Sequence, residues 1–475
     1  GGVEGDVAYE GVLAPVREGS RTLALELDTD LAGVLIDAPA PLGKAADRAV
    51  PTRLLATFQS DGMSVNVDAE RWVQARLWRD AGGALRGSLG LSVAPPVPAP
   101  DGVHVRAETD AIDGDAWIAW TAARLGEMSE GEGSTRLLNR LDVSGDELLL
   151  GALPLGPAEI SVLPLEGGYR MQVDAQGLSG DLWLGDDGAV ILDLDHLDLP
   201  AQEEGAVPPD YAEIGRALAD LGGAIVRVDA LTVGGEDYGE WSFRLEAGGE
   251  RGAFALADLV AEVRGVVLTG RDGGTARLDV MPLDVTPDAP GAVRSAFDGI
   301  VRMDDLATVL EAWAYPPAVE ARAVQVDARL EWFGGPGDFT LEALDGTIDL
   351  ELRDGRFVQV EGGTGALRVL GIFNVAEIAR RVRLDFSDVF RKGLTFESVT
   401  GRVDLASGLL VLSDPLVMKG PSSAMTLTGS WEVSSDDVSG NLVLTLPVSR
   451  NLPWMAAYAI AASNPLTGAG LLLAN

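Results

Sequence analysis

The sequence predicts a mainly β protein in which antiparallel hairpins follow one another along the chain. Apolar and polar residues alternate with period two in short runs, as in strands that bury one face. The alternation is clear in Leu23–Asp28, Trp241–Glu246 and Val326–Trp332. The chain has 475 residues, more than one compact core usually holds, so we expect several domains or one long repetitive sheet.

Turn residues separate the runs. Asp-Gly pairs tolerate the positive φ angles that tight hairpins need, so they predict many hairpins in series. Such pairs begin at residues 61, 101, 113, 187, 272, 298, 345 and 354.

Arg402–Ser413 shows what one such hairpin implies. If Ser407-Gly408 is a two-residue loop, alternation places two sets of residues on opposite faces. The apolar face then carries Val403, Leu405, Leu410 and Leu412, and the other face carries Arg402, Asp404, Val411 and Ser413.

Helical periodicity is scarce and predicts only a few short helices, mostly in the C-terminal third. One is expected within Met303–Ala314, where Asp304 and Asp305 suit the first turn and Pro316 follows the end. Others are expected at Thr364–Arg381 and Tyr211–Leu221.

The last stretch, Asn451–Asn475, has no charged side chain. A bilayer span needs about 20 continuous apolar residues, and Asn464-Pro465 divides this stretch into shorter pieces. We expect two small helices that serve as an end cap of the fold or as a membrane-contacting tip.

Charge excludes one class of partner. The chain has 36 Lys and Arg against 73 Asp and Glu, a formal net charge of -37. Such a surface repels nucleic acid and anionic headgroups, so any membrane contact must be local and apolar or bridged by divalent cations. With no cysteine, disulfides and thiolate sites are absent. The start, Gly1–Glu4, has no basic and apolar leader, as expected of a piece of a longer protein.

No pattern of residues points to catalysis. The two histidines, His104 and His196, lie in strand-like contexts, and the aspartates near His196 follow the rhythm of a solvated strand. Metalloprotease, nucleophile-elbow, P-loop and dinucleotide-binding motifs are missing. Gly362–Gly365 is expected to be an ordinary helix entry. We therefore expect no catalytic residues, no metal and no cofactor.

A long sheet with one aliphatic face must hide that face. It can pack against a second sheet, or it can curl into a trough that holds something apolar such as acyl chains. Alternation alone does not decide which. The candidate wall positions, each of which could equally be ordinary core, are Leu23, Leu25, Leu27, Val326, Leu330, Val403, Leu405, Leu410, Leu412, Leu427, Leu442 and Leu444.

A distinctive run extends from Phe339 to about Pro453. It includes Phe339–Leu341, Leu352–Arg356 and Leu384–Phe390, followed by Lys392-Gly393 and Phe396. A second phrase, Ala38–Lys44, lies near the start. These segments resemble the C-terminal half of the YhdP-type AsmA-like proteins of Gram-negative bacteria, which are similar to AsmA and TamB proteins.

The resemblance implies an elongated, curled antiparallel sheet, a β-groove, and no enzyme. Residues 1–300 are expected to form a repetitive groove segment and residues 301–475 an AsmA-like segment with helices and the apolar tail. The implied function is passive movement of phospholipid across the periplasm, between inner and outer membranes. Acyl chains are the implied partners, and an N-terminal helix outside this sequence is the implied inner-membrane anchor.

Two other functions are open at this stage. The sheet could be a structural or assembly scaffold of the cell envelope whose apolar face is fully packed. It could also be a carbohydrate-active enzyme on a β-rich solenoid, because a catalytic pair of carboxylates would be hidden among the many aspartates.

Overall fold

The structure is a computed structural model that describes residues 2–16, 21–117, 120, 137–151, 153–201, 210–249, 252–283, 292–317, 319–358, 394–421, 423–435 and 437–445. Its internal contacts divide the chain into two units. The first unit comprises residues 1–204 and 220–236, and the second comprises residues 205–219 and 237–475. The predicted helix at Thr364–Arg381, the segments 384–393 and 362–365, and the tail Asn451–Asn475 lie outside the described residues.

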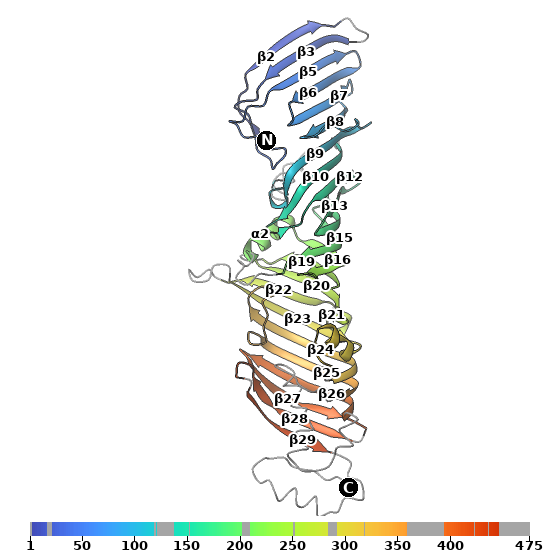
Figure 1. Ribbon diagram of the computed structural model, residues 1–475, viewed down its shortest axis with the longest axis vertical. Coiled ribbons are helices and arrows are strands. Elements are labelled where there is room, and N and C mark those ends of the chain that lie inside the picture. The colour runs from blue at the N-terminus through green and yellow to red at the C-terminus, as the bar shows by residue number, and fades with distance from the viewer. Residues whose placement is uncertain are drawn as a thin grey trace, which may run out of the picture. The chain divides into compact units, whose positions relative to one another are not determined.

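The first unit is one curled sheet (Figure 1), and its strands β1 and β4 form a separate two-stranded sheet. Its strands are β1 (Val3–Glu4), β2 (Tyr9–Pro15), β3 (Arg21–Thr29), β4 (Leu35–Ile36), β5 (Thr52–Gln59), β6 (Gly62–Ala69), β7 (Val73–Asp80), β8 (Leu85–Leu91), β9 (Gly102–Asp113), β10 (Leu138–Leu150), β11 (Leu153–Pro154), β12 (Ala158–Leu165), β13 (Gly168–Ala175), β14 (Leu178–Gly185), β15 (Val190–Leu199), β16 (Ala224–Val228) and β17 (Leu231–Val233).

The second unit has the same plan, with most strands paired to the next along the chain (Figure 1). Strand β18 (Glu236–Asp237) lies at the division. The second unit contains α2 (Tyr211–Leu221, with its last two residues assigned to the first unit), β19 (Glu240–Ala247), β20 (Phe254–Val263), β21 (Val266–Thr269), η1 (Arg271–Gly273), β22 (Ala276–Pro282), β23 (Val293–Met303), α3 (Leu306–Ala312), β24 (Val319–Phe333), β25 (Asp345–Phe357), β26 (Leu394–Ala406), β27 (Leu409–Lys419), β28 (Ala424–Glu432) and β29 (Asp437–Thr445).

The mainly β fold with antiparallel pairing is confirmed, apart from three parallel steps in the first unit. They join β8 to β9, β9 to β10, and β15 to both β16 and β17. A parallel step needs a connection that returns along the sheet. Between β8 and β9 this is the Pro-rich segment 92–101, which runs against β8, where the Ala99 N–H donates to the Gly87 carbonyl at 3.2 Å.

Two of the predicted helices are confirmed. Helix α2 has the predicted bounds, and its Tyr211 stacks on Phe254 with ring centroids 6.5 Å apart. Helix α3 is shorter than Met303–Ala314 because β23 extends to Met303. Asp305 is its N-cap residue, and its carboxylate accepts from the N–H groups of Ala307 and Thr308 at 3.0 and 3.2 Å. The described helices are therefore not concentrated in the C-terminal third.

The hairpin predicted at Ser407-Gly408 is confirmed, since both residues have positive φ and Ala406 pairs with Leu409. Turns at Asp298, Asp345 and Asp354 were expected from their Asp-Gly pairs, and that expectation is wrong. Asp298-Gly299 lies inside β23, and the other two pairs lie inside β25. At Gly299 a Cβ would come within 2.5 Å of the Phe297 ring, so the glycine serves close packing and not a reversal.

The expected division at residue 300 stays a prediction, and Ile300 and Val301 are consecutive residues of β23. The division into two units falls elsewhere, around α2 and β18.

Replacing the α3 cap tests how this helix is held. Asp305→Ala removes two hydrogen bonds from the first turn, and we expect it to lower the free energy of unfolding by about 1 kcal/mol. Urea unfolding followed by tryptophan fluorescence measures the change. Asp304→Ala is the matched control, because Asp304 is exposed and caps nothing, and it should change stability by less than about 0.5 kcal/mol. Equal losses for the two variants would contradict the assignment of Asp305 as the cap.

Candidate functional site

Strand register gathers the apolar side chains of the first unit on one side of its sheet, which we name its apolar face. Leu25 of β3 pairs with Ala56, Ala56 with Val65, and Val65 with Leu77. Residues paired across strands point to the same side, so each strand continues the face of the previous one. Further along, the face is continued by the in-register residues Val105, Leu141, Val162, Met171, Leu182, Leu192 and Val226.

The second unit has its own apolar face, built in the same way. Val326 of β24 pairs with Leu350, and Val403 of β26 pairs with both Ile348 and Leu412. The face then passes through pairs on the last strands: Leu410 with Trp431, and Leu427 with Leu442.

Burial along these faces is uneven. Leu405 is 4% exposed and packs in a cluster with Trp332 and Leu344, whereas Leu410 beside it is only partly buried. A second buried cluster surrounds Met418 and Met425. Seven candidate wall residues are partly buried and pack against these two clusters: Val326, Leu330, Val403, Leu410, Leu412, Leu427 and Leu442. The faces thus combine buried islands with partly open aliphatic surface.

All twelve candidate wall residues fall on the two apolar faces by register. Leu23, Leu25 and Leu27 are partly buried members of the first unit's face. The other nine belong to the second unit, and Leu444 is placed there by its backbone pairing with Met425. Leu405 is part of the core, so it is the least open of the set. Whether any of them contacts lipid stays a prediction.

The candidate set omitted the aromatic members of the same faces. Trp241, Phe243 and Phe297 pack against the cluster of Leu405, and Phe58 pairs with Leu23 in the first unit. The period-two pattern of Trp241–Glu246 indicates Trp241 and Phe243, but it gives no signal for Phe297 or Phe58.

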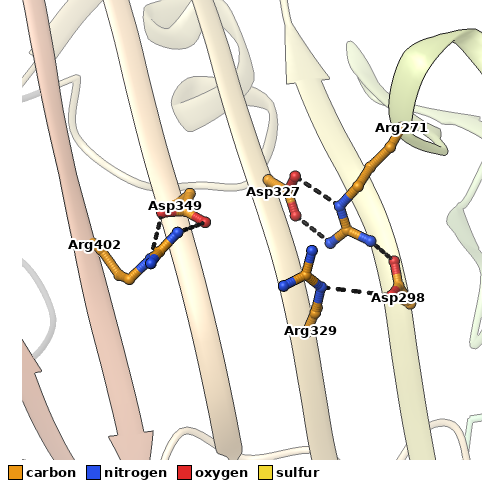
Figure 2. Close-up of polar contacts among 6 residues, drawn as sticks. All are labelled: Arg271, Asp298, Asp327, Arg329, Asp349 and Arg402. Atoms are coloured by element: carbon orange, nitrogen blue, oxygen red, sulfur yellow. Dashed lines mark hydrogen bonds and ion pairs between the residues drawn. The ribbon is translucent and has the colours of Figure 1, made fainter. Parts of the chain in front are cut away.

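The opposite side of each sheet, which we name its polar side, carries most of the charged residues of the strands, and arginines link its acidic side chains. Figure 2 shows this side of the second unit, where Arg271 lies between Asp298 and Asp327 and hydrogen-bonds to both. Arg402 binds Asp349 through Nε and Nη2 at 2.7 and 2.9 Å. The hydrogen bond from Arg271 lowers the pKa of Asp327 from its ordinary value of 3.8, although partial burial opposes this shift.

The first unit has a comparable cluster around Asp142. Burial alone would raise the pKa of this carboxyl, but hydrogen bonds from Ser161, His104 and Arg140 outweigh it and lower the pKa. The His104 Nε2 atom lies 2.8 Å from Asp142 Oδ2, and Ser161 Oγ lies 2.7 Å from Oδ1. Ser161 contacts the carboxylate and not the imidazole, so the three residues do not have the connectivity of a nucleophilic triad.

His196 has a different set of partners. Its Nδ1 lies 2.6 Å from Ser179 Oγ, and its Nε2 lies 3.3 Å from the Gln176 carbonyl. Within the described ranges, no group of three or more His, Cys, Asp or Glu side chains could hold a metal ion.

The segment Ala38–Lys44 forms a loop whose backbone carbonyls accept hydrogen bonds from tryptophan side chains. The indole Nε1 of Trp72 donates to the Pro41 carbonyl at 3.0 Å, and Trp117 donates to the Ala40 carbonyl at 3.1 Å. Lys44 is buried, and its ammonium donates to the Val34 and Ala45 carbonyls at 2.9 and 3.0 Å. A buried cation needs such acceptors. The segment Ala38–Lys44 therefore has a structural role, which is to hold this loop in place.

Comparison with known proteins identifies the family of this chain. A family model described as YhdP protein matches residues 2–475. The chain belongs to the YhdP family. It is 22% identical over 490 residues to the intermembrane phospholipid transporter YhdP of Escherichia coli K12. The alignment covers all of this chain and 37% of that relative, so the chain spans little more than a third of the transporter.

No solved structure matches this YhdP-family chain. Among the residues that the structure describes, no helix is both long and apolar enough to cross a membrane.

The polar side makes stability depend on pH. Because the pKa of Asp327 is lowered in the folded state, its contribution is present above pH 3.8 and is lost as pH falls through the folded-state pKa. Arg271→Gln should therefore lower the free energy of unfolding by about 1–2 kcal/mol at pH 7 and flatten its decline below about pH 4. Urea unfolding at pH 7 and at a series of acidic pH values measures both.

Arg329→Gln is the matched control for this prediction. Arg329 is 61% exposed and its Nε lies 3.7 Å from Asp298 Oδ2, so its removal should cost less than about 0.5 kcal/mol. It should also change the acid dependence less than Arg271→Gln does, because Arg329 lowers the pKa of Asp327 by its charge alone and without a hydrogen bond. If both variants give the same pH profile, Arg271 does not set the titration of Asp327.

Proposed function

We propose that this chain is part of a conduit that conducts phospholipids between the inner and outer membranes. The observation that carries the proposal is the pair of apolar faces, each continuous across many strands and only partly buried by its own protein. The described helices α2 and α3 each cover only a small part of the second unit's face. The name of the Escherichia coli relative, an intermembrane phospholipid transporter, supports the same reading.

The physical requirement is an apolar surface outside the bilayer. Each methylene that leaves hydrocarbon for water costs about 0.8 kcal/mol, so an acyl chain needs apolar contact along its whole path. Partly buried Leu, Val and Ile side chains supply such contact without a deep pocket that would trap the chain. The headgroup would stay in water while the tails move from strand to strand.

The proposal places the chain in the periplasm with phospholipid tails as its ligand. No catalytic residue, metal or cofactor is part of it. An inner-membrane anchor, as the family resemblance implies, would belong to the whole protein. Membrane contacts at the two ends are likewise part of the proposal.

One observation favours the scaffold alternative, but only for a limited part of the second unit's apolar face. Leu405, Trp332 and Leu344 pack into a buried cluster, as the interior of a purely structural sheet would do. A scaffold requires such packing along the whole face. Partly buried residues next to this cluster, such as Leu410 and Val403, argue for the conduit.

Adjacent residues on opposite sides of β27 allow a matched test. Leu410 is a partly buried member of the apolar face, and Val411 is 37% exposed on the polar side. Leu410→Asp introduces a carboxylate that tails would have to desolvate, so we expect about tenfold less phospholipid to copurify with the protein, measured by mass spectrometry. Val411→Asp adds the same charge and should leave the lipid load unchanged.

Circular dichroism separates loss of lipid from loss of fold in these variants. A photoreactive residue at position 410 gives a second readout, since the conduit requires it to crosslink to phospholipid in cells, whereas one at position 411 should not. Equal lipid load in both aspartate variants, or no lipid on the parent chain, would refute the conduit.

A further inference from the structure

One cation interrupts the apolar face of the first unit between Leu23 and Leu91, in β3 and β5 to β8. In β3, β5, β6, β7 and β8, the strand pairs between Leu23 and Leu91 place Met63, Arg79 and Leu85 side by side on this face. Every other position that the same pairs assign to the face in these five strands is uncharged. Arg79 therefore lies where alternation predicts an apolar residue.

Arg79 is also without a carboxylate partner. It is exposed and forms no ion pair with any residue that the structure describes, in a chain whose net charge is -37. The nearest acidic residue in sequence, Asp80, alternates to the polar side, and its Oδ1 accepts from the Ala84 N–H at 2.9 Å within the turn that follows. On the polar side, by contrast, Arg53 binds Asp28 and Glu26.

The surroundings leave the guanidinium open to a ligand. Arg79 is the penultimate residue of β7, and the turn after it contains Gly82 and Gly83. A Cβ built on Gly83 would lie 3.7 Å from Arg79 Nη2, so glycine keeps this side of the guanidinium uncovered. The cation thus lies at the end of the strand, at the margin of the apolar face.

Distances along β7 suit a lipid with its phosphate at this margin. The six residue steps from Val73 to Arg79 span about 20 Å at about 3.3 Å each. On the apolar face this path passes Leu77, which is partly buried, and Ala75, which is buried. It ends at Val73, which packs against the cluster of Val50, Ala69 and Trp72. Each leaflet of a bilayer holds its tails in about 15 Å, half of the hydrocarbon thickness. Tails lying along the path would bring the phosphate beside Arg79.

We propose that Arg79 binds the phosphate of a phospholipid whose acyl chains lie on the apolar face of the first unit. This inference rests on the proposed function and deepens it by giving the face a headgroup contact. A guanidinium can donate two hydrogen bonds to phosphate oxygens, which matches the phosphodiester better than a neutral headgroup. The contact at the margin would orient the lipid and leave its tails free to move across strands.

The competing explanation is that Arg79 only keeps an apolar margin soluble, with its methylenes over Met63 and Leu85 and its charge in water. A solubilising residue would not distinguish lipids with a phosphate from lipids without one. The choice of ligand therefore separates the two explanations.

The test compares Arg79→Gln with Arg76→Gln on the full chain. Arg76 is on the same strand, is exposed and has no ion pair with a described residue, but it faces the polar side. Native mass spectrometry measures binding of phosphatidylglycerol and of the diacylglycerol with the same acyl chains. We expect Arg79→Gln to weaken phosphatidylglycerol binding about tenfold and to leave diacylglycerol binding unchanged. Arg76→Gln should change neither.

The remaining outcomes are distinct. If Arg79→Gln leaves phosphatidylglycerol binding unchanged, weakens both lipids equally, or matches Arg76→Gln, the headgroup contact is wrong although the conduit stands. If the parent chain binds neither lipid, the proposed function fails as well. Glycerol phosphate at the same concentration should not displace the lipid; displacement would assign Arg79 to a free phosphate and overturn the proposal. Circular dichroism checks that both variants keep the sheet.

Discussion

Register between neighbouring strands is the constraint on which the apolar faces depend. Side chains alternate with period two, so a shift of one residue between β26 and β27 would exchange Leu410 for Val411 on the face. Where one strand has an extra residue, a β-bulge accommodates it and the register continues beyond it. In β20 the pairing moves from Leu256 to Leu259 around Asp258, whose φ is 52°, and the next apolar residue returns to the same side. Within each unit, each strand thereby continues the apolar face of the strand before it.

The same register collects the acidic residues on the other side, where repulsion between carboxylates must be limited. Arginines do this at intervals by bridging strands, as Arg271 does between Asp298 and Asp327. Such pairs are partly exposed and individually modest in energy. Arg271 also lowers the pKa of Asp327, which keeps that carboxylate charged further into acid.

Alternation and turn chemistry were enough to predict the β class, the hairpin at Ser407-Gly408 and the side of each candidate wall residue. They could not predict the parallel steps, because pairing of β8 with β9 depends on the path of segment 92–101 and not on the strands themselves. Asp-Gly pairs also misled, since Gly299 is required by contact with the Phe297 ring. Nor could alternation separate buried Leu405 from partly open Leu410: that difference comes from Trp332 and Leu344, which are distant in sequence.

Uneven burial has a consequence for movement of a hydrocarbon chain. Strands repeat about every 4.8 Å, so a surface of similar aliphatic residues offers neighbouring positions of nearly equal free energy. Barriers between such positions are low because no polar group must be desolvated. Leu405 and Met418 are buried by their neighbours. Beside them, the apolar face of the second unit is exposed only in part, at residues such as Leu410, Leu412 and Leu427. On the proposed function, passage of an acyl chain through the second unit is slowest beside these buried clusters, where fewer aliphatic side chains are available for contact.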